Sequence, residues 1–151
     1  MVHIVYCDDK EKVLEKIISG TKTMVIRGAA GRKIPHSRVF DGETLYFMKK
    51  GTGKISAKAN VVNVENHVKL TQDESLNIIQ KNGDKLNLSK KQINRWNKKC
   101  LCLVEFNNLE EIDSLELDHQ KNMDDWLIVE KVEDVLVGTS IDYNYDKTKL
   151  K

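Results

Sequence analysis

LYFMKKGTGKISAKANVVNV, residues 45–64, is the stretch of this 151-residue sequence that limits the fold most strongly. Its first four residues form an apolar run after the turn signal Asp41-Gly42, and Gly51-Thr52-Gly53 is a second turn signal. Small or apolar residues then alternate with polar ones, which is typical of a half-buried strand: Ile55, Ala57, Ala59 and Val61. The stretch therefore predicts a β-hairpin with strands at 45–48 and 54–64.

Three further strands and three short helices are expected around this hairpin. The strands are predicted at 23–26, 100–106 and 126–132. One helix is predicted over 8–20, with Asp8 and Glu11 as its capping box and Gly20 at its end. The other two helices begin at the capping boxes Thr71/Glu74, with Gly83 at the end of the first, and Ser89/Gln92, before Trp96.

These elements predict an α+β fold in which a mixed or antiparallel sheet, or a small barrel, is built from about five to six strands. A chain of this length is expected to form one domain, which we place at residues 1–136. An acidic loop is predicted at 107–125, and a polar C-terminal tail at 137–151.

The cysteines and the apolar runs bear on where the protein resides. Cys7, Cys100 and Cys102 are odd in number and do not form a disulfide framework, so buried free thiols are expected. No apolar run approaches the roughly 18 residues that span a bilayer, and no secretory signal is visible at the N-terminus. We therefore expect a cytoplasmic protein without a membrane partner.

Charge is strongly segregated along a chain whose net charge is only +2. Residues 21–58 carry nine basic and two acidic side chains, and residues 81–99 carry seven basic side chains and one acidic. Residues 100–151 carry five basic and thirteen acidic side chains. The basic segments favour a polyanion as ligand, unless the acidic third of the chain folds back and pairs with the lysines.

The segment Gly28-Ala29-Ala30-Gly31-Arg32-Lys33 is the first candidate for an anion-binding loop. Two glycines would allow backbone N–H groups to approach an anion, and the adjacent cations would add charge; a plain surface loop is the alternative.

Aromatic residues near the basic segments could stack on bases, although core packing is the commoner role for Trp96 and Tyr46. The scattered histidines and cysteines match no metal-binding spacing, so neither a metal nor a cofactor is expected.

The stretch Ser19-Gly20-Thr21-Lys22-Thr23-Met24-Val25-Ile26-Arg27 resembles the ASCH domains of the PUA-like superfamily, in which a K-T segment leads into a strand that closes on arginine. The resemblance continues through Asp41-Gly42-Glu43, the hairpin 46–58 and the strand 103–106, and so covers residues 10–106. It implies a barrel-like sheet flanked by helices, a cleft between the barrel and the first helix, and RNA binding.

Some ASCH relatives hydrolyse the acyl group of an acetylated cytidine, and their proposed catalytic set is a lysine, a threonine three residues later and a glutamate. Lys22 matches that lysine. Val25 stands at the threonine position and has no hydroxyl to act as a nucleophile. Glu65 or Glu74 could stand in for the glutamate.

The sequence thus favours a noncatalytic module that binds RNA or a modified nucleotide in a basic cleft. A hydrolase (an amidohydrolase or a ribonuclease) that uses Lys22, and a protein-interaction domain that uses the acidic loop, remain alternatives. The expected ligand-binding residues lie in the first basic segment: Lys22, Arg27, Arg32, Lys33, Arg38, Tyr46, Lys49, Lys50 and Lys54. Strand alternation places Lys22 and Arg27 on opposite faces, so they share a pocket only if the chain bends between them.

Overall fold

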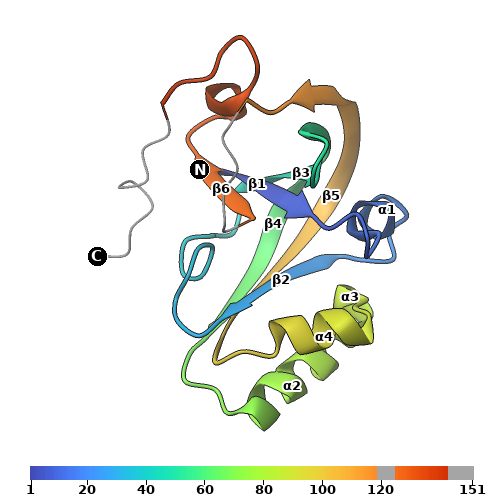
Figure 1. Cartoon of the computed structure of the whole chain (residues 1–151), viewed down its shortest axis with the longest axis vertical. Coiled ribbons are helices and arrows are strands. Elements are labelled where there is room, and N and C mark those ends of the chain that lie inside the picture. Colours follow the sequence, from blue (N-terminus) through green and yellow to red (C-terminus); the bar gives the residue numbers. More distant parts are fainter. Residues whose placement is uncertain (119–124, 143–151) are drawn as a thin grey trace.

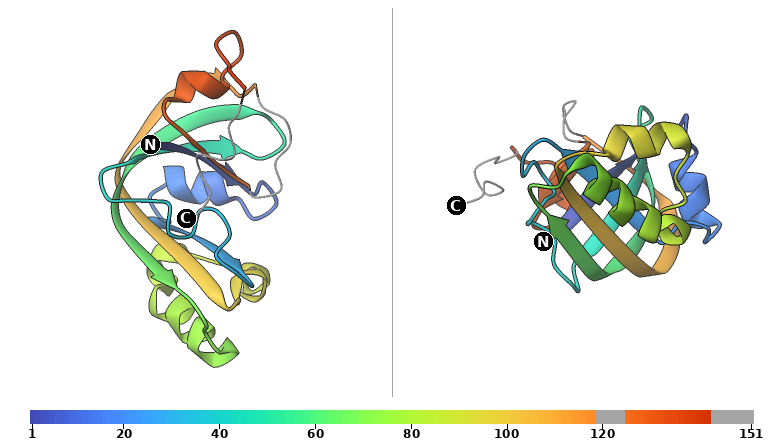
Figure 2. Two further views of the ribbon diagram at one scale, coloured as in Figure 1. Left: turned by 90° about the vertical axis from the view of Figure 1, so that its left-hand side faces the viewer. Right: turned by 90° about the horizontal axis from the view of Figure 1, so that it is seen from below.

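The computed structural model describes residues 1–118 and 125–142, and its central feature is one six-stranded mixed sheet with the order β2-β5-β4-β3-β1-β6. The strands are β1 (Val2–Cys7), β2 (Met24–Ala29), β3 (Thr44–Lys49), β4 (Lys54–His67), β5 (Cys100–Glu116) and β6 (Trp126–Val129). β1 and β3 are parallel, and the other neighbouring strands are antiparallel. The sheet curls into a half-barrel (Figures 1 and 2), which confirms the predicted α+β class.

The predicted hairpin is β3–β4, and its alternation has the expected meaning because Ile55, Ala57, Ala59 and Val61 are buried. The predicted acidic loop at 107–125 is wrong over its first ten residues, which continue β5 as far as Glu116. There the acidic strand pairs with the lysine-rich start of β4, so that Glu116 lies opposite Lys54 and Glu110 opposite Lys58. Residues 119–124 of that loop lie outside the described residues.

β1 was not among the predicted strands. Its sequence VHIVYC is buried on both sides, so it shows no alternation of apolar and polar residues. Both faces of β1 are covered, because Val5 and Cys7 face one apolar cluster while Ile4 and Tyr6 face another, and a strand covered on both faces produces such a continuous run.

Four α-helices are present in the described part of the chain, together with one 3₁₀ turn, η1 (Val132–Val135). The helices are α1 (Val13–Ile18), α2 (Gln72–Lys81), α3 (Gly83–Leu86) and α4 (Lys90–Trp96). The capping boxes predicted for α2 and α4 are both formed. Gly83, expected to end a helix, begins α3 instead. No helix among the described residues is long and apolar enough to cross a membrane.

The helix predicted at 8–20 is shorter than expected. Asp8 does not cap it; its carboxylate accepts a hydrogen bond from the backbone N–H of Lys10, and the chain reaches α1 through Lys12 in the left-handed conformation. Glu11 accepts a hydrogen bond from the Ser89 hydroxyl instead of closing a capping box. The side chains that would cap the helix are therefore used to fix the preceding turn and to contact α4.

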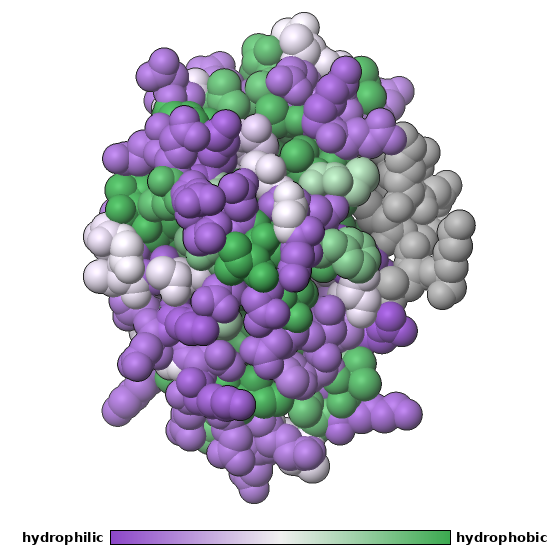
Figure 3. Space-filling view, turned by 180° about the vertical axis from the view of Figure 1, so that it is seen from behind, coloured by the Kyte–Doolittle hydropathy of each residue, from purple (hydrophilic) through white to green (hydrophobic). Residues whose placement is uncertain are grey.

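Apolar side chains gather in three clusters around the sheet. The largest fills the inside of the curl, where α1 packs against alternate residues of all six strands. A second lies beneath α2, α3 and α4, against Met24 and Ile26 of β2 and Leu101 and Leu103 of β5. The third joins β1, β6 and η1. Seen from behind, most of the surface is hydrophilic, with apolar residues in scattered patches (Figure 3).

Gly28 lies inside β2 and not in a loop, which corrects the expectation that Gly28 and Gly31 form an anion-binding turn. A Cβ atom at Gly28 would lie 2.5 Å from the backbone oxygen of Trp96 and 3.1 Å from Leu101 Cδ2. The glycine is required because the C-terminal end of α4 packs directly on the β2 backbone.

We predict that Gly28→Ala lowers the free energy of unfolding by about 1–3 kcal/mol, since the rigid Trp96 carbonyl must move to admit the methyl group. Gly31→Ala is the matched control, because nothing lies within 4 Å of its added Cβ. Urea unfolding measures both variants. Equal stability of the two would show that α4 does not pack on β2 in this way.

Candidate functional site

A cleft with two lobes lies between α4 and the strands β1 and β2. The inner lobe is narrow, with a volume of about 30 Å³, and is bordered by residues that include Val5, Lys22 and Val25. The outer lobe, of about 120 Å³, follows β2 onward to Lys33 and His36. Four residues line both lobes and thus join them: Arg27, Arg95, Trp96 and Asp125.

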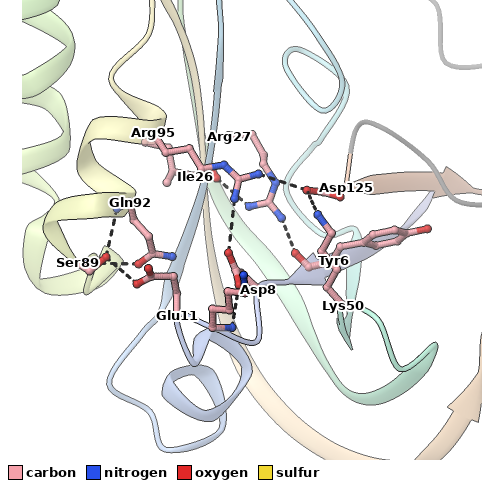
Figure 4. A network of polar contacts seen from close by, with 11 residues as sticks. Tyr6, Asp8, Glu11, Ile26, Arg27, Lys50, Ser89, Gln92, Arg95 and Asp125 are labelled. Atoms are coloured by element: carbon pink, nitrogen blue, oxygen red, sulfur yellow. Dashed lines mark hydrogen bonds and ion pairs between the residues drawn. The ribbon is translucent and has the colours of Figure 1, made fainter.

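Arg27 bridges the open seam of the half-barrel, because β1 and β2 are not neighbours in the sheet. Its Nη2 donates a hydrogen bond to the Tyr6 carbonyl of β1 at 2.8 Å, and its Nη1 donates to the Ile26 carbonyl at 2.9 Å (Figure 4). The guanidinium carbon lies 5.4 Å from the ring centres of both Trp96 and Trp126. Nε is buried and has no hydrogen-bond partner within the described residues.

Lys22 lies at the side of the inner lobe and is only 3% exposed. Its Nζ donates a hydrogen bond to the Leu86 carbonyl, and within the described residues it forms no ion pair. Burial, followed by repulsion from Arg27 and Lys16, lowers the pKa of Lys22 from 10.5 to about 7. The side chain therefore titrates near neutral pH, as few lysines do.

Arg95 projects from α4 over the cleft, with its guanidinium carbon 4.5 Å from the Trp96 ring centre. It lies between two carboxylates, with Nη1 3.6 Å from Asp8 Oδ2 and Nη2 3.4 Å from Asp125 Oδ2. The Lys50 ammonium reaches the same Asp125 oxygen at 2.9 Å (Figure 4). Because arginines cover Trp96, its ring is not a free stacking platform for a base.

The position of α4 depends on contacts with the turn before α1. The Ser89 hydroxyl donates to Glu11 Oε2 at 2.7 Å, and Ser89 Oγ accepts a hydrogen bond from the Gln92 backbone N–H in the capping box (Figure 4). The capping box at Ser89 determines where α4 begins. The hydrogen bond from Ser89 to Glu11 then attaches the first turn of α4 to the segment that carries Asp8.

The structure brings some of the sequence-predicted site residues together and separates the others. Lys22, Arg27, Lys33 and Lys50 border the cleft. Strand alternation holds, since Met24 and Ile26 face the helices while Val25 faces the inner core, yet Lys22 and Arg27 both reach the inner lobe. Lys22 can do so because it precedes the first residue of β2.

The remaining predicted residues do not line either lobe. Lys49 pairs with Asp9 and Glu15, and Lys54 lies opposite Glu116 in the β4–β5 ladder. Tyr46 packs against the third apolar cluster. Arg32 is exposed beside the cleft, and the Arg38 guanidinium donates to the carbonyls of Arg32 and His36.

Asp8, Arg95 and Asp125 are cleft residues that sequence reasoning did not identify. Arg95 belongs to the second basic segment, residues 81–99, and is next to Trp96. Only the packing of α4 on Gly28 brings this segment close to the first basic segment, residues 21–58. Asp8 was expected only as a helix cap, and nothing in the local sequence distinguishes Asp125 from the other acidic residues.

The expected catalytic partners of Lys22 are not assembled in the cleft. Val25 does border the inner lobe, but neither Glu65 on β4 nor Glu74 in the capping box of α2 lines either lobe. Among the described residues, the carboxylates at the cleft are Asp8 and Asp125. Across residues 1–118 and 125–142, no three His, Cys, Asp or Glu side chains are grouped so as to hold a metal ion.

The lowered pKa of Lys22 predicts a specific dependence of stability on pH. Above pH 7 the folded amine is neutral while the unfolded amine stays protonated, so the unfolded state binds more protons and the free energy of unfolding rises with pH. From pH 6 to 8.5 this gain is about 2 kcal/mol, and Lys22→Met should lack it. Urea unfolding of both proteins at the two pH values measures the difference; parallel pH profiles would contradict the assignment.

Comparison with known proteins supports the fold. No protein-family model matches the sequence, and no curated protein matches it. Among solved structures, the ASCH protein from Zymomonas mobilis matches with a TM-score of 0.64 at 11% identity, over 86% of this chain and 88% of that one. A mutant of that protein with serine replaced by alanine matches with a TM-score of 0.65 at 11% identity, over 86% and 89% of the two chains.

A second mutant of the Zymomonas mobilis protein, with tyrosine replaced by phenylalanine, gives a TM-score of 0.64 at 12% identity, over 86% of this chain and 91% of that one. These likenesses extend over most of both chains. The fold that the resemblance of residues 10–106 implied is confirmed: this chain has the fold of an ASCH domain.

Proposed function

We propose that the protein is a noncatalytic module that binds RNA or a modified nucleotide in the cleft between α4 and the strands β1 and β2. The observation that carries this proposal is the presence of a buried Lys22 and a half-buried Arg27 at the cleft, where no carboxylate of the described residues contacts either one. The ASCH-like fold also supports this proposal, because the resemblance to ASCH domains implies RNA binding. The comparisons themselves concern the fold alone.

The physical support comes from the cost of burying cations. A buried charge is expensive unless it is paired, and among the described residues the carboxylate whose charge acts on Arg27 is that of Asp125. Strongly perturbed groups in a cleft are candidates for ligand contact. A phosphate-bearing ligand would supply the missing negative charge, and Lys33 and exposed Arg32 would extend the positive surface along its backbone.

A hydrolase is the second candidate, because a lysine with a pKa of about 7 can act as a general base at neutral pH. Asp8 or Asp125 would have to supply the carboxylate, and Val25 leaves the threonine position without a nucleophile. Turnover of acylated nucleosides or short RNAs that Lys22→Met abolishes would support the hydrolase; a screen without turnover would leave the binding module.

A protein-interaction domain is the third candidate, with the acidic stretch as its surface. Part of that stretch lies in β5, where Glu110 pairs with Lys58 and Glu116 lies opposite Lys54, so these acids already face basic partners within the chain. Retention of the protein on heparin resin rather than on an anion exchanger would favour the nucleic-acid module.

We predict that the protein binds short single-stranded RNA with an affinity that falls steeply with salt, because phosphate contacts release counterions. Arg95→Gln and the double variant Arg32→Glu with Lys33→Glu should each weaken binding by about tenfold or more. Binding should also weaken from pH 6 to pH 8.5, since the Lys22 ammonium loses its proton. Fluorescence anisotropy at two salt concentrations measures these effects.

Lys81→Gln is the matched control, since Lys81 ends α2 and does not line the cleft. Loss of affinity that is equal for Lys81→Gln and Arg95→Gln would mean that RNA meets general surface charge. The cleft would then not be the binding site.

A further inference from the structure

One carboxylate, that of Asp125, lies where cationic groups from three separate elements meet. Its Oδ2 is 2.9 Å from Lys50 Nζ and 3.4 Å from Arg95 Nη2. Its charge also acts on Arg27, whose pKa it raises against the dominant effect of burial. Lys50 follows β3, Arg95 belongs to α4 and Arg27 to β2, so no local pattern in the sequence indicates this meeting point.

The contacts around Asp125 leave cationic donors incompletely used. Arg95 makes only long contacts with the carboxylates, at 3.4 Å to Asp125 and 3.6 Å to Asp8. Arg27 Nε is buried without a hydrogen-bond partner in the described part of the chain. Lys50 and Arg95 both reach the same carboxylate oxygen, so the second oxygen takes no part in either ion pair. A tetrahedral phosphate has more oxygens than a carboxylate and could serve several cations from one position.

Asp125 is anchored through its backbone and not only through its side chain. Its carbonyl accepts a hydrogen bond from the Tyr6 N–H at 3.2 Å, and its φ of 54° lies in the left-handed region, which aspartate tolerates better than most residues. The carboxylate is 15% exposed, so it is reachable from the cleft. Rotation of the side chain alone can therefore withdraw the carboxylate while the backbone stays attached to β1.

We propose that Arg27, Lys50 and Arg95 form a subsite for a phosphate group, and that the Asp125 carboxylate is an internal anion that the phosphate displaces. The identity of the ligand as a nucleotide or RNA rests on the function proposed above. The subsite specifies which group of that ligand is recognised, namely a single phosphate at the junction of the two lobes. It also specifies that the Asp125 carboxylate competes with this phosphate.

The arrangement of charge around the junction favours a phosphate over a neutral group. Four cationic residues border the inner lobe, against two carboxylates: Lys22, Arg27, Lys50 and Arg95, against Asp8 and Asp125. Withdrawal of the Asp125 carboxylate leaves Asp8 as the one acid among the described residues of this lobe.

Calorimetric titration of the intact protein at low salt tests the subsite directly. The probes are inorganic phosphate, the four ribonucleoside 5′-monophosphates and the matching nucleosides. Each monophosphate should bind at least about tenfold more tightly than its nucleoside, and Lys50→Gln or Arg95→Gln should remove that difference. Asp125→Asn should bind inorganic phosphate about tenfold more tightly than the parent, because it loses a competing and repelling charge.

Asp9→Asn is the matched control, since Asp9 pairs with Lys49 and does not line the cleft. Phosphate affinity that is the same in Asp125→Asn, Asp9→Asn and the parent would overturn the displacement of the carboxylate. If Asp125→Asn does not fold, the Lys50→Gln and Arg95→Gln titrations decide the existence of the subsite.

The outcomes separate the subsite from the proposed function. Equal affinity for nucleosides and monophosphates refutes the subsite even where RNA binds. Inorganic phosphate that binds in an Arg95-dependent manner, without binding of nucleotides or RNA, supports the subsite and refutes the proposed function. Absence of phosphate binding in both the parent and Asp125→Asn refutes the subsite.

Discussion

The hydrogen bond from Arg27 to the Tyr6 carbonyl is the interaction on which the cleft depends. A sheet with the order β2-β5-β4-β3-β1-β6 leaves β2 as an edge strand, and its curl brings β2 near β1 without joining them. Arg27 spans that seam and lies against Trp96 and Trp126. The same seam is where the inner lobe opens, so one side chain both joins the two strands and places a positive charge in the cleft.

The distribution of charge follows from how the chain pairs its strands. The acidic half of β5 lies beside the basic start of β4, and the Lys49 ammonium is shared by Asp9 and Glu15. Many lysines that looked available in the sequence are thereby matched within the fold. Lys22, which is buried, and Arg27, which is half-buried, are different, because no carboxylate of the described residues touches them. Lys50 and Arg95 meet on one aspartate. Many basic side chains elsewhere in the fold are paired with acidic ones, whereas those at the cleft are only partly paired.

Local rules predicted the parts of the fold that local energetics determines. The hairpin alternation and the capping boxes at Thr71 and Ser89 all form as expected. β1 was not predicted because a strand covered on both faces shows no alternation of apolar and polar residues. The predicted β5 ended too early because its acidic second half looked like a loop, whereas acidic residues opposite lysines are stable in an exposed ladder. Lys22 and Arg27 were identified through the K-T segment, whereas Arg95 and Asp125 reach the cleft only through the packing of α4 on Gly28 and the anchoring of residue 125 on β1. Such contacts join residues about 70 to 120 positions apart, and no pattern within either segment encodes them.

The ionisation of Lys22 is the most direct measure of whether the cleft is built for an anion. Nuclear magnetic resonance of the lysine side-chain Cε and Nζ groups gives the pKa of Lys22 in the free protein and after addition of a short single-stranded RNA. We expect a pKa of about 7 in the free protein, and a clear rise of this pKa on RNA binding because a nearby phosphate stabilises the ammonium form. A pKa near the ordinary lysine value of about 10.4 that RNA leaves unchanged would contradict it.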